Sequence, residues 1–303
     1  MKLFDLHADL GYAVAKKRKE GHSRVLSSFY TDALRKGGIK AVFMACWFDG
    51  SQDFEQMCAM IQALKADIAQ CEEVKLVCDG RMIDWTDDKI YAMLSVEGMC
   101  GIDRDPETRL DWLYAQGVRM GSLCWNEENA LASGTRSQKG LTPLGIRAVR
   151  HMERIGMRID VSHASERTFW DIAEHTEGIL VASHSNAAAL CAHPRNLSDE
   201  QIRLIGRRKG IIGATAVGAF VDGKKGYQDI GHLARHVERL CRCAGDAHVG
   251  FGFDFERYYD GSGDGLRGLE GPEQCGALID WLKRDPRYEK TACENAVRIF
   301  SFE

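Results

Sequence analysis

The chain has 303 residues, of which 45% are hydrophobic and 28% charged, the composition of a globular protein that buries a core. Forty basic and forty-four acidic side chains leave a net charge of −4, which gives no reason to expect nucleic acid or an anionic membrane as partner. No apolar run approaches the roughly 18 residues of a membrane span, and the first residues do not resemble a signal peptide. The 11 cysteines, without a C-x-x-C spacing, are typical of free thiols, so we expect a cytoplasmic protein.

Short apolar runs alternate along the chain with longer amphipathic segments, the pattern of β-α units around a parallel sheet. Readable helix ends separate them. One predicted helix begins at Pro106 and ends before Gly117. Others are expected to begin at Thr142, Ser165 and Ser198. The apolar runs predict strands over residues 2–6, 39–46, 91–96, 118–123, 157–161, 179–183, 210–215 and 247–253, with a weaker candidate at 74–78.

Eight strands that alternate with helices predict a (β/α)8 TIM barrel of the α/β class. No low-complexity tract or Pro/Ser/Gly linker marks a boundary, so we expect a single domain over residues 1–303. The alternative is an open doubly wound sheet. That fold usually carries a glycine-rich turn after the first strand, whereas residues 7–11 read HADLG here, which favours the barrel.

The carboxyl ends of the predicted strands carry side chains suited to metal binding, and in this fold the chemistry gathers there. His7 and Asp9 are two residues apart, so on an extended segment both point to the same face. Three histidines with several carboxylates suit Zn²⁺ or a neighbouring divalent ion, and Glu97 is the natural carboxylate to bridge two ions. The residues expected at these strand ends are His7, Asp9, Glu97, Trp125, Asn126, His163, His184, Asp254 and Glu256.

Each of these residues has an ordinary structural explanation when it is taken alone. A histidine at a strand end is more often a hydrogen-bonded structural residue, Glu97 before a glycine can be a loop carboxylate, and Asp254 can cap a helix. The other seven histidines fall mostly in helix or loop segments and are expected to take no part. The joint pattern, with several ligand types on one end of a barrel, favours a metal centre.

Several short phrases, in order along the whole chain, give the sequence its resemblance to a known family. They are D-x-H-x-D at 5–9, E-G at 97–98, G-V-R at 117–119, L-T-P-x-G at 141–145, D-V-S-H-A-S at 160–165, A-S-H-S-N at 182–186, H-P-R-N at 193–196 and E-N-A-x-R at 294–298. With them the chain resembles the membrane (renal) dipeptidase family of the amidohydrolase superfamily, as a microbial-type cytoplasmic member. Each phrase is weak alone, and the ordered set is specific.

The resemblance implies a metallo-dipeptidase that cleaves dipeptides, with an L- or D-residue at the carboxyl end, by a hydroxide that bridges two zinc ions. Co²⁺ or Mn²⁺ in place of zinc, and a homodimer, are also compatible with it. It further implies that Asp254 moves the proton and that Arg195 binds the terminal carboxylate, which suits a guanidinium fork. The implied ligands are His7, Asp9 and Glu97 for one ion, and the shared Glu97 with His163 and His184 for the other.

The chain departs from the family pattern near the expected substrate. Trp125 stands in L-C-W-N where many relatives have a substrate-contacting histidine in L-T-H-N. An indole N–H donates a hydrogen bond but neither accepts one nor takes up a proton. The phrase G-F-D-F-E at 252–256, where relatives tend to have G-S-D-F-D-G, places Phe253 and Glu256 near the site. We therefore expect Trp125 and Asn126 to contact substrate, and substrate choice to differ from that of relatives.

Two other functions remain open at this point. The first is another amide hydrolase on the same barrel, such as a deaminase or cyclic-amide hydrolase. Such enzymes typically begin with H-x-H, whereas residues 7–9 read H-x-D, and some use a lysine on the fourth strand, where residues 118–126 contain none. The second is a barrel that keeps its metal without catalysis, and the presence of both Asp254 and Arg195 disfavours it.

Overall fold

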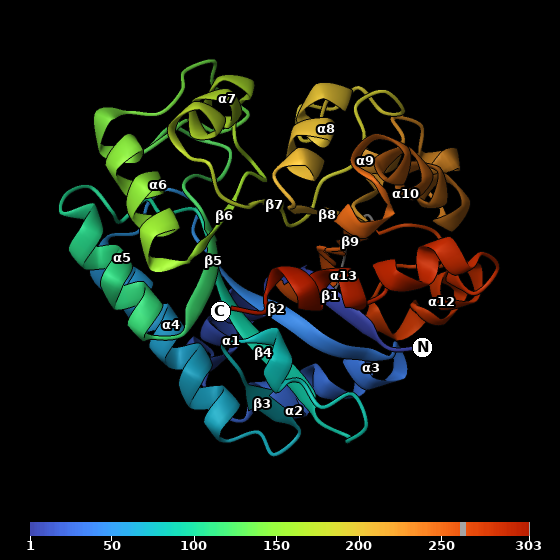
Figure 1. Cartoon of the computed structure of the whole chain (residues 1–303). Helices are drawn as coiled ribbons and strands as arrows, with labels where there is room; N and C mark the ends of the chain where they lie inside the picture. Colours follow the sequence, from blue (N-terminus) through green and yellow to red (C-terminus); the bar gives the residue numbers. More distant parts are fainter. Residues whose placement is uncertain (261–264, 303) are drawn as a thin grey trace.

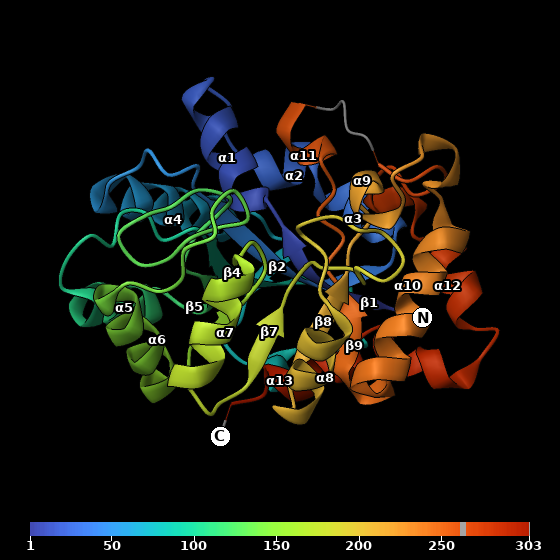
Figure 2. The same cartoon turned by 90° about the horizontal axis from the view of Figure 1, so that it is seen from above.

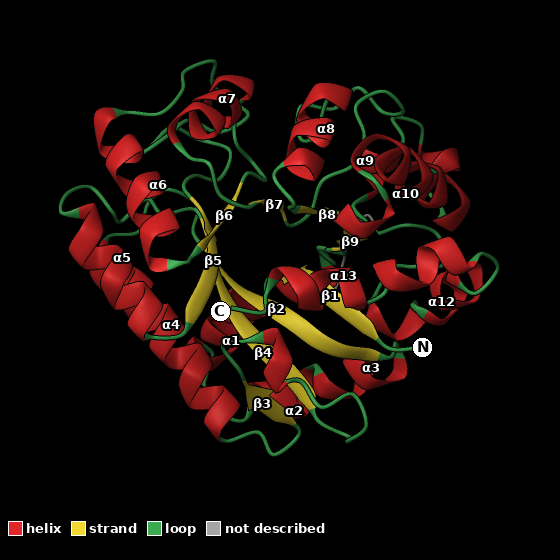
Figure 3. Ribbon diagram, viewed as in Figure 1, coloured by secondary structure: helices red, strands yellow, loops and turns green. Residues whose placement is uncertain are grey.

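The computed structural model describes residues 1–260 and 265–302, and within them nine strands form one sheet in the order β2-β1-β9-β8-β7-β6-β5-β4-β3 (Figures 1 and 3). Because β2 also pairs with β4, eight strands close into a ring, and the pairings between them are parallel. The predicted (β/α)8 barrel is confirmed, and the open sheet is excluded. The strands are β1 (Leu3–Ala8), β2 (Ile39–Trp47), β3 (Val74–Leu76), β4 (Ile90–Glu97), β5 (Val118–Ser122), β6 (Arg158–Asp160), β7 (Leu180–Ala182), β8 (Ile211–Ala214) and β9 (Val249–Phe251).

The weak strand candidate at 74–78 corresponds to β3, which lies outside the ring. It pairs with the start of β4, where Val74 lies opposite Ile90. Further along β4, where Leu94 lies opposite Val118, β5 takes its place as the neighbour. All eight strands predicted for the barrel are present, with ends that differ by a few residues from the predicted ones.

The helices surround the ring, and three predicted starts coincide with capping side chains. Thr142, Ser165 and Ser198 each accept a backbone N–H from the first turn of the helix that follows. No helix in residues 1–260 and 265–302 is both long and apolar enough to cross a bilayer. The α-helices are α1 (Leu10–Lys19), α2 (Val25–Phe29), α3 (Thr31–Lys36), α4 (Phe54–Ala69), α5 (Pro106–Ala115), α6 (Pro143–Ile155), α7 (Glu166–His175), α8 (Asp199–Arg207), α9 (Gly218–Val221), α10 (Ile230–Ala244), α11 (Arg257–Asp260), α12 (Gly276–Leu282) and α13 (Glu294–Ile299). Short 3₁₀ helices are η1 (Gly80–Met82), η2 (Lys225–Tyr227), η3 (Asp246–His248), η4 (Pro272–Gln274) and η5 (Pro286–Thr291).

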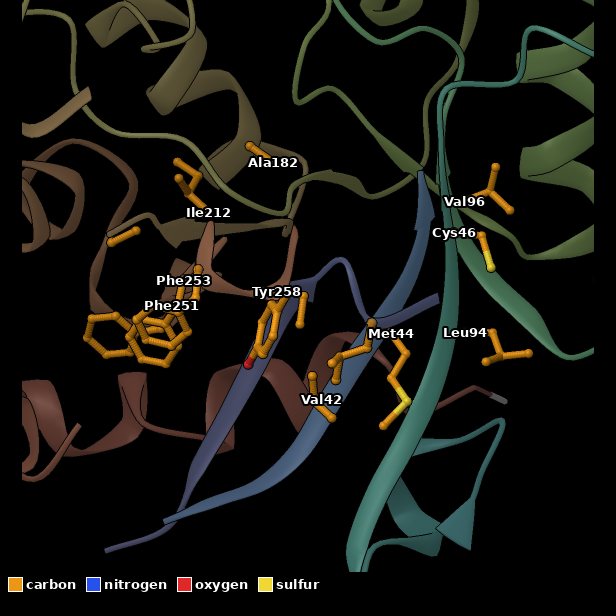
Figure 4. Close-up of a cluster of buried hydrophobic side chains, with 14 of the residues drawn as sticks. Val42, Met44, Cys46, Leu94, Val96, Ala182, Ile212, Phe251, Phe253 and Tyr258 are labelled. Carbon is orange, nitrogen blue, oxygen red and sulfur yellow. The ribbon is translucent and has the colours of Figure 1, made fainter. Parts of the chain in front are cut away.

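Both faces of the barrel strands are buried, which explains why they read as continuous apolar runs in the sequence. On β2, Phe43 belongs to the cluster inside the ring with Phe4 and Phe300, whereas Val42 and Met44 belong to the cluster between the ring and the helices. Figure 4 shows this outer cluster, with side chains from β2, β4, β7, β8 and β9. Alternate residues of one strand therefore stabilise two different layers.

The last helix, α13, closes one end of the barrel. Phe300 follows it directly, and its ring centroid lies 4.5 Å from that of Phe43 and 6.3 Å from that of Phe4. Phe4 is near the start of β1, so α13 lies at the amino ends of the strands. In Figure 2 it is at the lower edge, and α1 and α11 are at the upper edge. The carboxyl ends of the strands are left open at the other end, where a site is expected.

Candidate metal centre and active site

Four of the five predicted metal ligands gather around the fifth, Glu97, which is the last residue of β4. Its Oε2 lies 3.4 Å from Nε2 of His7, which β1 provides. Its Oε1 lies 2.5 Å from Nε2 of His163 and 3.5 Å from Nε2 of His184, which follow β6 and β7. Oδ2 of Asp9 lies 3.4 Å from Nε2 of His7. The two oxygens of Glu97 thus face two different groups of side chains.

Hydrogen bonds at Nδ1 determine which ring nitrogen of His163 and His184 carries the proton. Nδ1 of His163 lies 3.0 Å from Oδ1 of Asn126, an amide oxygen that only accepts. Nδ1 of His184 lies 2.7 Å from Oγ of Ser183, whose own proton goes to the carboxylate of Asp160. Each neutral imidazole therefore carries its proton on Nδ1 and presents a lone pair at Nε2.

These lone pairs meet in a buried space that fits a divalent cation. The Nε2 atoms of His163 and His184 are 2.9 Å apart, and neither has a proton to share. Nε2 of His7 is buried and has no hydrogen-bond partner among the described residues. A divalent ion with nitrogen and oxygen ligands would satisfy all of these atoms. Among the described residues, two sets of side chains have ligand atoms within 4.8 Å of one another: His7, Glu97 and His184; and His7, Asp9 and Asp254.

Burial and charge shift the pKa of Glu97 and of the three histidines in the cluster. Burial raises the pKa of Glu97 to about 8, against the lowering effect of His7. Burial also lowers the pKa of His163 and His184 well below 6.5, and the positive charge of Arg195 lowers both further. For His7, burial is outweighed by the neighbouring carboxylates, Glu97 first, and the pKa is well above 6.5. A bound cation would favour the ionised carboxylate and the neutral imidazoles that ligation requires.

A second layer of hydrogen bonds holds the ends of β6 and β7 together. Oδ1 of Asp160 accepts the backbone N–H of Ser162 at 2.9 Å and that of Ser183 at 3.0 Å. The backbone N–H of His184 in turn donates to Oγ of Ser162 at 3.2 Å. No role was predicted for Asp160, Ser162 or Ser183, although they stand in the phrases D-V-S-H-A-S at 160–165 and A-S-H-S-N at 182–186. The two serines that precede the histidines both serve to position His184.

Asp5 does for β1 and β9 what Asp160 does for β6 and β7. Its Oδ1 accepts the backbone N–H of His7 at 3.1 Å and that of Phe253 at 2.9 Å. The N–H of Asp254 donates to the carbonyl oxygen of His7 at 3.2 Å. Asp5 was also missed, although it opens the D-x-H-x-D phrase. This buried carboxyl fixes the strand ends that carry a proposed ligand and the proposed proton carrier.

The backbone is strained at two of the predicted site residues. His163 has a φ of 68° and Asp254 a φ of 55°, the left-handed region that few residues other than glycine adopt. Gly98 has a φ of 81°, and a Cβ there would lie 2.8 Å from the carbonyl oxygen of Phe48, so only glycine fits after Glu97. Strained backbone gathers at functional sites, so these positions support a functional role for this end of the barrel.

A cavity of about 500 Å³ adjoins the cluster and brings in the other predicted residues. Arg195 lines it with a buried side chain, and its Nε has no hydrogen-bond partner in the described part of the chain. Asp254 lines it too, and its Oδ1 lies 3.8 Å from Nε2 of His7. Burial raises the pKa of Asp254 to about 7, against the lowering effect of His7. Glu256 is a further lining residue.

Trp125 and Asn126 also line the cavity. The ring of Trp125 packs edge-on against that of Trp47 at 5.1 Å. Oδ1 of Asn126 accepts from the hydroxyl of Thr135 at 2.9 Å and lies beside Nδ1 of His163, so it holds the imidazole in place. The structure thus gives Asn126 a positioning contact that the sequence did not indicate, in addition to its place on the cavity wall.

Comparisons with known proteins identify the family of the chain. The family model of the membrane dipeptidases (peptidase family M19) matches residues 1–302. An uncharacterized dipeptidase of Schizosaccharomyces pombe is 28% identical over 314 residues, 92% of this chain and 73% of the relative. An uncharacterized protein of the pqqA 5′ region of Klebsiella pneumoniae is 36% identical over 203 residues, 63% of this chain and 69% of the relative.

Among solved structures, a metallo peptidase from Rhodobacter sphaeroides, with a phosphinate mimic of L-Ala-D-Ala bound, shares the fold. Its TM-score is 0.85 at 21% identity, over 99% of this chain and 98% of that chain. The fold and the family model therefore agree with the resemblance that the ordered phrases indicated. The chain belongs to the membrane dipeptidase family, peptidase family M19, and is a metallo-dipeptidase.

Proposed function

We propose that this enzyme holds two zinc ions that share Glu97 and that it cleaves the peptide bond of dipeptides. The observation that carries the proposal is the orientation of Glu97, whose Oε2 faces His7 while its Oε1 faces His163 and His184. Asp9 would complete the ligands beside His7. The nitrogen and oxygen ligands suit zinc, and Co²⁺ or Mn²⁺ are the alternatives.

Two bound cations would lower the pKa of a water held between them to about 7 and polarise the scissile carbonyl. Asp254 would accept a proton from the attacking water and give it to the leaving amine, as general base and then general acid. Its backbone N–H bond to the carbonyl of His7 holds it in position relative to the ligands.

Arg195 is the proposed anchor for the carboxylate of the substrate. Its guanidinium is buried at the cavity, and no carboxylate of the described residues forms an ion pair with it. A planar fork of donors binds a carboxylate through two parallel hydrogen bonds, and a buried pair of this kind is strong. Anchoring one end in this way would restrict the enzyme to short peptides. Trp125 and Asn126 are the proposed side chains in contact with the rest of the substrate.

The remaining proposals concern the whole chain. We propose that residues 1–303 act as one catalytic domain, since every strand of the described part belongs to a single sheet. A homodimer is retained as a proposal, and light scattering on the purified protein tests it.

One experiment tests the proposed chemistry. The protein is purified without chelators, its metal content is measured, and L,L and L,D dipeptides are assayed with the wild type and with Asp254→Asn. We expect two metals per chain in both proteins, and hydrolysis that falls by at least about 100-fold in the variant, the scale of general acid–base catalysis. Two metals without turnover of any dipeptide would exclude this substrate class and point to another amide. Absence of metal would exclude the site itself.

A further inference from the structure

The cavity wall formed by the ends of β2 and β5 is aromatic. Trp47 ends β2 and lies opposite Glu97 in the register with β4. Its ring meets that of Trp125 at 5.1 Å and that of Tyr12 at 4.9 Å, both edge-on. The ring of Trp125 lies 6.0 Å from that of His163. An apolar surface therefore directly borders two of the proposed ligands.

The buried cation lies across the cavity from Trp47. In the closed ring β2 lies across from β7, and Figure 1, which looks along the barrel, shows the two on opposite sides. Arg195 stands in the loop after β7, and its Cζ lies 5.4 Å from the centre of the Phe220 ring. The aromatic wall and Arg195 line the same cavity of about 500 Å³. The proposed ligands lie between them.

We propose that Trp47 and Trp125 form the subsite for the amino-terminal side chain, and that the enzyme prefers dipeptides whose first residue is bulky and apolar. This inference rests on the proposed function. When the carboxylate is bound at Arg195 and the scissile carbonyl lies at the ligand cluster, the first residue extends toward the tryptophan wall. Consecutive Cα atoms are about 3.8 Å apart, so a dipeptide held at its carboxylate and its scissile carbonyl is too short for its first residue to reach another part of the cavity. Aromatic rings gain most from contact with apolar surface.

An acidic occupant fits this wall less well. Arg136 is a cation beside it, with Cζ 5.6 Å from the centre of the Trp125 ring. Its guanidinium is already paired with the carboxylate of Glu127. The wall therefore offers an acidic side chain no free positive charge from Arg136, and it offers an apolar one two indole rings.

The test is a specificity panel. We measure kcat/KM for X-Ala dipeptides with X as Gly, Ala, Leu, Phe or Glu, in L-Ala and D-Ala series, for the wild type, Trp125→Ala and Trp125→Phe. We expect the wild type to prefer Phe over Gly by about tenfold or more, the scale on which an apolar pocket discriminates. The Phe/Gly ratio should fall at least about fivefold in Trp125→Ala and be largely retained in Trp125→Phe.

The outcomes separate this inference from the proposed function. Similar kcat/KM values for all five X residues within a series, or an unchanged Phe/Gly ratio in Trp125→Ala, overturn the subsite alone. A preference for Glu would assign the wall to Arg136 and overturns it as well. No hydrolysis of any peptide by metal-loaded wild type overturns the proposed function and this inference with it. If Trp125→Ala does not fold, the wild-type preference among the five X residues still tests the subsite.

Discussion

The hydrogen bond between Ser183 and His184 predicts that Ser183→Ala weakens metal binding. Oγ of Ser183 accepts from Nδ1 of His184 at 2.7 Å and donates to Asp160, and all three side chains are buried. Alanine leaves the Nδ1–H without an acceptor. In the metal-free protein the imidazole can move its proton to Nε2, toward Glu97 Oε1 at 3.5 Å. With metal bound it cannot, because Nε2 is the ligand atom.

The loss therefore falls on the metal-bound state. Removal of such an outer partner typically lowers metal affinity by about 10–100-fold, or about 1.4–2.8 kcal/mol. Competition with a chromogenic chelator measures the affinity directly. Ser95→Ala is the matched control, because Ser95 is a buried strand serine whose Oγ has no hydrogen-bond partner among the described residues. Zinc affinity within twofold of wild type in Ser183→Ala would refute the role of the Ser183 hydrogen bond. An equal loss of affinity in Ser95→Ala would show that removing any buried serine hydroxyl weakens metal binding.

Three further outcomes follow from the same structure. Asp5→Ala should lower the free energy of unfolding in urea by about 1–3 kcal/mol for each of the two buried N–H groups that lose their acceptor, those of His7 and Phe253. Asp5→Asn keeps an acceptor and should lower it less. Equal losses in the two variants would contradict the role of Oδ1. A strong chelator should lower Tm, and added zinc should restore it. A ligand that binds only the native state stabilises it by about 4 kcal/mol when its free concentration is 1,000 times Kd. A Tm that does not change with chelator would count against the metal centre. Arg195→Lys should raise KM about tenfold or more for dipeptides with a free carboxylate, but not for their carboxyl-terminal amides. An equal effect on both kinds of substrate would contradict the proposed role of Arg195 in binding the carboxylate.

Much of the fold could be predicted from the sequence because the barrel strands are buried on both faces. Runs such as residues 41–46 are apolar throughout, and capping residues such as Ser165 and Ser198 mark where helices begin. The candidate at 74–78 was ambiguous for a physical reason. Its three paired residues lie outside the ring and pair only with the first residues of β4. They are not buried on both faces, so the segment lacks the continuous apolar run that identifies the other strands.

The candidate site was predictable only in its inner layer. Parallel strands end at one edge, so His7, Glu97, His163 and His184 could be brought together from their places after apolar runs. The layer behind them depends on contacts between strands far apart in the chain, such as Asp5 with the backbone of Phe253. No local pattern reports such a contact. The left-handed backbone at His163 and Asp254 likewise follows from tertiary packing and not from residue type.

The most direct test of the central claim is anomalous X-ray scattering at the zinc edge from crystals of the protein purified without chelators. We predict two peaks on either side of the Glu97 carboxylate, the ions being about 3.5–4 Å apart. One should lie against His7 and Asp9, and the other against His163 and His184. A single peak that does not touch Glu97, or no peak among these side chains, would contradict the account.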